Sequence, residues 1–205
     1  MIRLSSIIDI IFPSRYSYNE VVNIPKAPAC EIPNVFPLFD YHSSSGKKLV
    51  YGIKKHRDRI LSRHIATYMA EHMQEYLSEQ QQFSFFLAPL IIPVPITKKQ
   101  EHKRGFNQSE NIARYFAQSI DGIYSRNLVI KSRETQKQAL LTKRTERFIN
   151  VQNCFSIAAK YKGQLDHQDI IIIDDLVTTG ATIRSLEKTL RAAGARNVIA
   201  ITVGH

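Results

Sequence analysis

The residues best suited to chemistry lie near the C-terminal end of the chain, in the stretch IIIIDDLVTTGAT at residues 170–182. The run of isoleucines predicts a buried strand, and that strand ends in Asp174 and Asp175. In an open α/β sheet the carboxyl ends of the strands form the ligand crevice, so we expect both carboxylates at the functional edge. Carboxylate oxygens at this position can accept hydrogen bonds from vicinal hydroxyl groups of a ligand.

The residues that follow the acid pair predict a phosphate-binding loop that leads into a helix. A glycine allows the backbone to approach an anion, and the N–H groups and dipole of the helix N-terminus favour negative charge. Threonine hydroxyl groups add further donors. A phosphate site beside a diol site predicts a ribose 5-phosphate group, and we expect that of phosphoribosyl pyrophosphate (PRPP). The expected phosphate-binding residues are Val177, Thr178, Thr179, Gly180, Ala181 and Thr182.

Three other interpretations of this stretch are weaker. A strand that ends in two aspartates also occurs in P-loop nucleotidases, but the chain has no GxxxxGK[ST] loop. A GxGxxG dinucleotide-binding turn is absent as well. Two acids at a strand end can be a simple turn, but the Thr-Thr-Gly-Ala-Thr sequence directly after them favours a ligand site.

The elements that would position these residues alternate along the second half of the chain. A buried strand, a helix with Asn107 as its N-cap, further strands and a helix that ends before Gly194 predict an α/β fold. Its core would be a parallel sheet flanked by helices. The expected strands are 85–94, 128–130, 170–173 and 198–203, and the expected helices are 107–120 and 181–193.

The first half of the chain predicts an N-terminal appendage. Residues 59–80 show the three- and four-residue spacing of an amphipathic helix. Residues 35–41 and 48–53 predict two short strands of a hairpin around a turn at 43–46. We therefore expect an appendage at 1–82 and an α/β domain at 83–205.

Composition limits the class of protein and its partners. A net charge of +10 and a pI of about 9.7 favour anionic partners such as nucleotides, pyrophosphate or nucleic acid. No stretch approaches the about 18 consecutive apolar residues of a membrane span, and the N-terminus lacks the features of a signal peptide. We therefore expect a cytoplasmic protein without a membrane span. The two cysteines, Cys30 and Cys154, lie far apart, which argues against a disulfide framework or a cysteine-rich zinc module.

Several separated motifs resemble the ComF/GntX family of competence-associated phosphoribosyltransferase-like proteins. They are the PRPP-type motif at 170–182, IIPVP at 91–95, RGFNQ at 104–108 before a helix, Thr135 and Gln136 with Gln138, and the stretch 49–55 with its following helix. The resemblance covers roughly residues 45–205 and implies a type I phosphoribosyltransferase fold. The family usually begins with a four-cysteine zinc ribbon, whereas this chain has no cysteine before Cys30, so we expect no zinc.

The resemblance also implies roles for individual residues. Arg104 and Gly105 would lie near the pyrophosphate of PRPP, although Arg104 could also belong to a solvated basic loop. Asp174, Asp175 and Arg104 would be the catalytic residues. Mg²⁺ would arrive with PRPP, near Asp174, and we assign no metal ligand from the protein. Residues 131–150 would form the hood that closes over the substrate.

Two functions remain open at this stage. The first is Mg²⁺-dependent transfer of a phosphoribosyl group from PRPP to an unidentified nucleophile, in a protein with a role in natural competence and DNA uptake. The alternative is a non-catalytic factor that handles single-stranded DNA together with other competence proteins and uses the nucleotide site for binding or regulation. In the alternative, the basic residues Lys137, Lys143 and Arg144 would contact the DNA.

Overall fold

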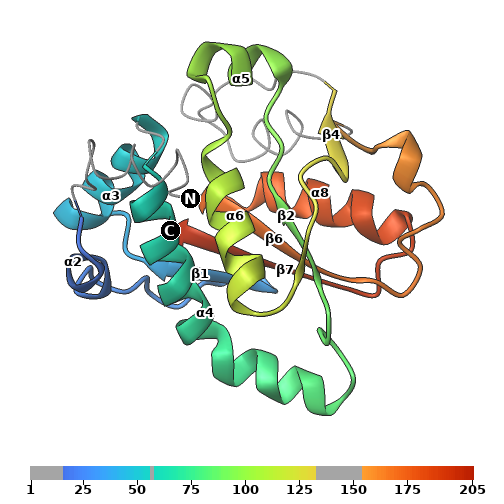
Figure 1. Ribbon diagram of the computed structural model, residues 1–205, viewed down its shortest axis with the longest axis horizontal. Helices are drawn as coiled ribbons and strands as arrows, with labels where there is room; N and C mark the ends of the chain where they lie inside the picture. Colours follow the sequence, from blue (N-terminus) through green and yellow to red (C-terminus); the bar gives the residue numbers. More distant parts are fainter. Residues whose placement is uncertain (1–15, 56–57, 133–153) are drawn as a thin grey trace, which may run out of the picture.

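A parallel sheet of five strands forms the centre of the computed structural model, which describes residues 16–55, 58–132 and 154–205 (Figure 1). The strand order is β1-β7-β6-β2-β3, and all of these neighbours run parallel. The α/β class and the parallel sheet predicted from the sequence are confirmed. The strands are β1 (Val35–Phe39), β2 (Leu90–Pro93), β3 (Ile123–Tyr124), β6 (Asp169–Leu176) and β7 (Asn197–Gly204).

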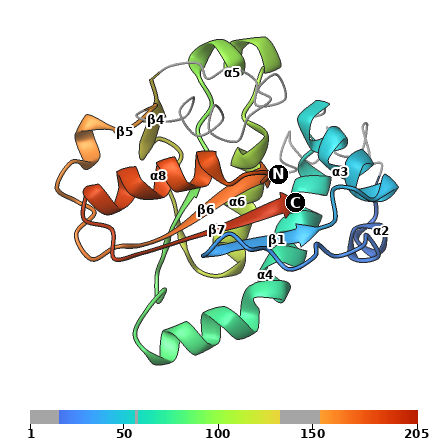
Figure 2. The same ribbon diagram turned by 180° about the vertical axis from the view of Figure 1, so that it is seen from behind.

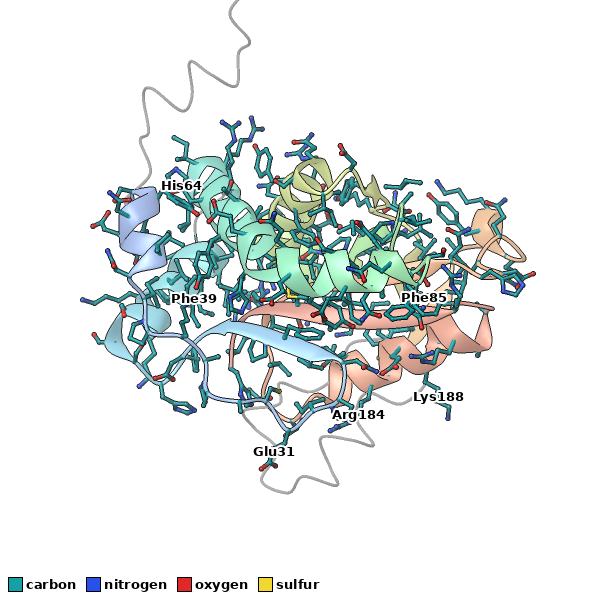
Figure 3. All side chains as sticks on the ribbon, turned by 90° about the horizontal axis from the view of Figure 1, so that it is seen from below. Glu31, Phe39, His64, Phe85, Arg184 and Lys188 are labelled. Atoms are coloured by element: carbon teal, nitrogen blue, oxygen red, sulfur yellow. The ribbon has the colours of Figure 1, made fainter. Side chains whose placement is uncertain are left out.

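Helices cover both faces of the sheet because successive side chains of a strand point to opposite sides. In β6, Ile171 and Ile173 belong to one buried cluster with residues of α4 (Arg59–Gln82) and α6 (Gln108–Ser119). Ile170 and Ile172 belong to the cluster on the other face, with α8 (Ala181–Ala192). Figure 3 shows α8 on one side of the sheet and α4 on the other, and Figure 2 shows α8 from the side that it covers.

The direction of winding reverses between β2 and β6. From β2 the chain passes through α6 to β3 on one side, whereas from β6 it passes through α8 to β7 on the other side. In doubly wound sheets the ligand crevice lies outside the carboxyl ends of the strands at such a switch point. The fold therefore predicts a ligand crevice at the carboxyl ends of β2 and β6.

The predicted N-terminal hairpin is wrong. Residues 35–39 do form a strand, β1, but it pairs with β7 in the central sheet, with Val35 opposite Ala200. Residues 44–55 form the helix α3 (Ser44–Lys55), whose buried side has Gly46, Leu49, Val50 and Ile53. These positions have helical spacing, but the serines and Gly46 resemble a turn. The residues after that turn are too few to distinguish the period of a helix from that of a strand.

The expected N-terminal appendage and α/β domain contribute to the same hydrophobic cluster. Leu61, Ile65 and Met69 of α4 are buried in it together with Ile112 and Phe116 of α6. The short helix α2 (Tyr18–Val22) also contributes Val21. The described residues on both sides of the expected boundary at 82/83 therefore share a core.

Two further strand predictions need correction. Strand β2 begins at Leu90 and not at residue 85, because Ser84 and Phe86 have positive φ angles of 62° and 53°. The strand expected at 128–130 is β4 (Val129–Lys131), but it pairs antiparallel with β5 (Phe155–Ile157) in a separate small sheet. Most of the hood expected at 131–150 lies outside the described residues.

Candidate functional site

The acid pair lies at the carboxyl end of β6, where the fold predicts a ligand crevice. Asp174 and Asp175 are both buried, with 9% and 5% of their surface exposed. Oδ1 of Asp174 accepts a hydrogen bond from the backbone N–H of Asp175 at 2.8 Å and lies 3.5 Å from the Ser109 hydroxyl of α6. Oδ2 of Asp175 lies 3.4 Å from Nζ of Lys54, at the end of α3, and makes no hydrogen bond with any described residue.

Burial and mutual repulsion change the protonation of this pair. Burial, followed by the negative charge of Asp175, raises the pKa of Asp174 to about 8. Two adjacent buried carboxyl groups cannot both ionise at low cost, so the raised pKa favours the protonated form of Asp174. Such a pair can both donate a hydrogen bond and accept one. Buried polar atoms left without partners are costly, and they are common where a ligand supplies the missing partner.

The loop between β6 and α8 presents several donors next to the acid pair. Gly180 is the N-cap of α8, and no side chain caps this helix end. The first N–H groups of an α-helix have no partner within the helix, and such helix ends are common anion-binding sites. The Thr179 hydroxyl is buried and makes no hydrogen bond with the described residues, while its carbonyl oxygen accepts a hydrogen bond from the Arg184 guanidinium. Thr178 is exposed.

Gly180 is required for a reason that the sequence did not reveal. Its φ of 69° lies in the left-handed region, which favours glycine. A Cβ atom at this position would lie 2.8 Å from Cδ1 of Ile32, in the segment before β1. Ile32 therefore packs on one side of the loop between β6 and α8, and its side chain would have to shift to admit a Cβ atom at this position. In Figure 3 the neighbouring Glu31 and Arg184 of α8 lie on the same side of the sheet.

The segment after β2 brings Arg104 and Gly105 to the same edge of the sheet. It forms helix α5 (Lys98–Arg104), which begins with a capping box of Thr97 and Gln100 and ends at Gly105, with a φ of 78°. Arg104 is exposed, and its Nη1 donates a hydrogen bond to Oε1 of Gln108 at 3.0 Å. Figure 1 shows α5 beyond the end of β2, above the start of α6.

Two contacts hold this segment in place. The predicted N-cap Asn107 is confirmed, and its side-chain amide also donates to the carbonyl oxygen of Val94, just after β2, at 3.0 Å. Arg126 bridges the two helices through ion pairs with Glu101 of α5 and, at 3.1 Å, with Glu110 of α6. No described contact joins Arg104 directly to the acid pair.

The sequence analysis missed four residues that contact the predicted site: Ile32, Lys54, Ser109 and Arg184. Arg184 lies one helical turn after the loop, so its position could have been inferred from the helix that was predicted. Lys54 could have been found only if residues 44–55 had been recognised as a helix. Ile32 comes from an irregular segment, and its proximity to Gly180 depends on the pairing of β1 with β7.

Other kinds of site find little support in the part of the chain that the structure describes. There, no group of three or more histidine, cysteine, aspartate or glutamate residues could hold a metal ion. Among the same residues, no helix combines the length and the apolar character needed to cross a membrane.

Curated proteins with related sequences have roles in competence and DNA use. The chain is 30% identical to Competence protein F of Haemophilus influenzae over 112 residues, which are 55% of this chain and 48% of that protein. It is 28% identical to the DNA utilization protein YhgH of Escherichia coli O157:H7 over 60% of this chain and 52% of that protein. It is 32% identical to Competence protein ComFC of Bacillus subtilis over 51% of this chain and 39% of that protein.

These matches confirm the predicted relation to the ComF family. The chain spans about half the length of Competence protein F and of the E. coli YhgH protein. No protein-family model matches the sequence.

Two solved structures have a similar arrangement of elements. One is the allosteric regulatory enzyme of purine biosynthesis, with 20% identity and a TM-score of 0.41 over 69% of this chain and 25% of that one. Another is the hypoxanthine-guanine phosphoribosyl transferase of L. donovani, with 11% identity and a TM-score of 0.41 over 70% of this chain and 71% of that one. Likenesses this distant add no evidence to the strand order and site geometry described above.

Proposed function

We propose that this protein binds a phosphoribosyl compound, PRPP in particular, at the carboxyl ends of β2 and β6. The observation that carries the proposal is the pairing of two buried, incompletely hydrogen-bonded carboxyl groups with an uncapped helix N-terminus one loop away. The carboxyl groups suit the ribose hydroxyls, and the helix N-terminus suits the 5-phosphate.

Each part of the ligand would meet a different part of the site. With its raised pKa, Asp174 would donate a hydrogen bond to one ribose hydroxyl, while an oxygen atom of Asp175 would accept one from the other. Backbone N–H groups at residues 178–182 and the Thr179 hydroxyl would surround the phosphate. Arg104 at the end of α5 would meet the pyrophosphate, for which a guanidinium group is well suited.

The residues present fit magnesium that is carried by PRPP. Carboxylate and phosphate oxygens are its preferred ligands, and the orphaned Oδ2 of Asp175 shows that this edge has oxygen atoms to spare. Bound magnesium would stabilise the charge of the departing pyrophosphate, near Asp174. The protein itself would orient the ribose and hold the phosphate in place. In this proposal the transfer reaction serves a protein of natural competence, as the names of its relatives suggest.

Thermal unfolding with and without ligand tests the binding site. A ligand at a hundred times its dissociation constant stabilises a fold by about 2.7 kcal/mol, which is several degrees for a chain of this size. We expect ribose 5-phosphate or PRPP with Mg²⁺ to produce this shift. The shift should shrink in Thr179→Ala, which removes one hydroxyl group, and disappear in Gly180→Val, which deforms the loop. If millimolar concentrations of either compound leave the parent protein unchanged, the proposal fails.

A test for catalysis separates the two functions. Release of pyrophosphate from PRPP, measured across a panel of bases and amines, would demonstrate transfer and identify the acceptor. Binding without release under all conditions would instead support a regulatory nucleotide site.

The alternative, handling of single-stranded DNA, is favoured by the net charge of +10 and by the name of the YhgH relatives. Its proposed contacts, Lys137, Lys143 and Arg144, lie outside the described residues. If they bind DNA, log affinity should fall with log salt by about 0.7 per phosphate contacted. Changing all three to Glu should flatten that dependence, whereas an unchanged slope would contradict this localisation.

A further inference from the structure

Helix α3 brings a lysine to the acid pair from a part of the chain that the sequence placed outside the site. Lys54 lies in the last turn of α3, and its Nζ is 3.4 Å from Oδ2 of Asp175. The alternation of side chains in β6 explains this contact, because Asp175 continues the face of Ile171 and Ile173. The hydrophobic cluster that contains Ile171 and Ile173 also includes Leu49, Val50 and Ile53 of α3.

The attachment of α3 makes this contact a built feature of the fold. The backbone N–H of Tyr41, between β1 and α3, donates to the carbonyl oxygen of His205 at the end of β7, at 3.0 Å. The Ser43 hydroxyl accepts a hydrogen bond from the N–H of Gly46 at 3.0 Å. With Ile53 buried beside it, the position of Lys54 is fixed by packing, although its side chain is 35% exposed.

The ion pair neutralises charge without occupying the oxygen atoms of Asp175. A hydrogen-bonded ammonium and carboxylate lie about 2.8 Å apart, whereas this pair is 3.4 Å apart and Oδ2 makes no described hydrogen bond. A positive charge at this distance attracts the carboxylate and orients it. The oxygen atom remains able to accept a hydrogen bond from a ligand.

We propose that Lys54 is a positioning residue of the phosphoribosyl site, which holds the carboxylate of Asp175 in the orientation that a ligand needs. This inference rests on the proposed function of the acid pair. The simpler explanation is that Lys54, like its neighbour Lys55, only stabilises the C-terminal end of α3 through the helix dipole.

Lys55 provides a matched control for that explanation. It lies in the same helical turn, but its Nζ lies over the ring of Tyr51, 5.3 Å from the ring centroid. Removing either charge changes the end of α3 and the net charge equally. Only Lys54 would change the ligand site.

The test is calorimetric titration of the full chain with ribose 5-phosphate and with PRPP and Mg²⁺. Lys54→Met should weaken binding by at least about tenfold, as expected when one partner of a close charge pair is removed. Lys54→Arg should restore most of the affinity, and Lys55→Met should bind like the parent. If Lys54→Met does not fold, Lys54→Gln, which keeps a polar side chain of similar length, replaces it.

A double variant distinguishes positioning from direct contact. If Lys54 acts through Asp175, Lys54→Met should cause no further loss of affinity in an Asp175→Asn background. An equal loss in both backgrounds would overturn the inference, because Lys54 would then contact the ligand itself. Unchanged affinity in Lys54→Met overturns this inference alone, whereas a parent protein that binds neither compound overturns both it and the proposed function.

Discussion

Both ends of strand β6 have buried aspartate, but the aspartates at the two ends differ in their hydrogen bonding. At the amino end, Asp169 accepts hydrogen bonds from Nε and Nη2 of Arg196, from the backbone N–H of Phe86 at 2.7 Å and from the side chain of Asn197 at 3.0 Å. At the carboxyl end, Asp174 and Asp175 have one backbone donor, one distant hydroxyl and one lysine between them.

The pKa values follow this difference in hydrogen bonding. Burial would raise the pKa of Asp169, but the hydrogen bonds from Arg196, Phe86 and Asn197 hold it below its usual range. Burial and the neighbouring carboxylate raise the pKa of Asp174 to about 8. The same strand therefore has a satisfied acid that holds the fold together and an acid pair in which Oδ2 of Asp175 makes no hydrogen bond with the described residues, as suits a ligand site.

The largest effect should come from breaking the satisfied end. Asp169→Ala would leave Arg196 without its carboxylate and the buried N–H of Phe86 without an acceptor. We expect the free energy of unfolding to fall by about 3 kcal/mol. Urea unfolding measures this loss, and the folded variant should still bind ribose 5-phosphate with the affinity of the parent. A variant with parental stability would show that this network contributes little.

Breaking the other end should have the opposite pattern. Asp174→Asn combined with Asp175→Asn should weaken ligand binding by about a hundredfold or more, because a neutral pair loses its charged acceptor. Stability without ligand should stay the same or rise, since the repulsion between the two carboxyl groups is removed. Calorimetry and urea unfolding on the same sample measure both quantities. Unchanged affinity in the folded double variant would remove the acid pair from the site.

A smaller effect is expected at the loop that the acid pair precedes. Gly180→Ala should destabilise the fold by about 1–3 kcal/mol, because the new Cβ would meet Ile32 and must adopt a positive φ. Ile32→Ala removes the steric contact but not the backbone strain. In the double variant part of the loss at Gly180 should therefore disappear, a coupling that urea unfolding of all four proteins would detect. Strictly additive effects would show that φ alone requires glycine.

The contrast between the two ends also shows what could be predicted from sequence. The isoleucine run at 170–173, the acids after it and the following helix form one local pattern, so the strand, loop and helix were all predicted within a few residues. The network of Asp169 was not predicted, because Phe86 lies 83 residues away in sequence and nothing local indicates the contact. Hydrogen bonds between residues that are far apart in the chain leave no periodic signal in the sequence.

The errors in the N-terminal half have the same origin. Strand β1 was found, but its partner was not, because pairing with β7 depends on the whole sheet. Because a hairpin was predicted there, helix α3 was missed, and Lys54 with it. The contact of Lys54 with Asp175 joins two regions that the sequence analysis had separated. The local strand, loop and helix were predictable, whereas the residues that contact them from other elements were not.

The smallest predicted effect concerns the pH dependence of stability. The folded-state pKa of Asp174, about 8, lies above its unfolded value of 3.8. The folded protein therefore binds more protons between these values, and the stability that Asp174 contributes is fully present below about pH 4 and is lost as the pH rises through about 8. Asp169 behaves in the opposite way, because its lowered pKa contributes stability at neutral pH that is lost only in acid.

Comparison with Asp174→Asn isolates this contribution, because asparagine stays neutral and all other titrating groups are common to both proteins. The variant should gain stability relative to the parent as the pH is raised from about 5, with a nearly constant slope to about pH 7 that flattens as the pH passes about 8. Urea midpoints at intervals across this range measure it. Asp175 must be retained in both proteins, since its charge is one of the two causes of the shift. A difference in stability that stays constant across the range would mean that Asp174 is already ionised at neutral pH, and its role as a hydrogen-bond donor to the ligand would then have to be abandoned.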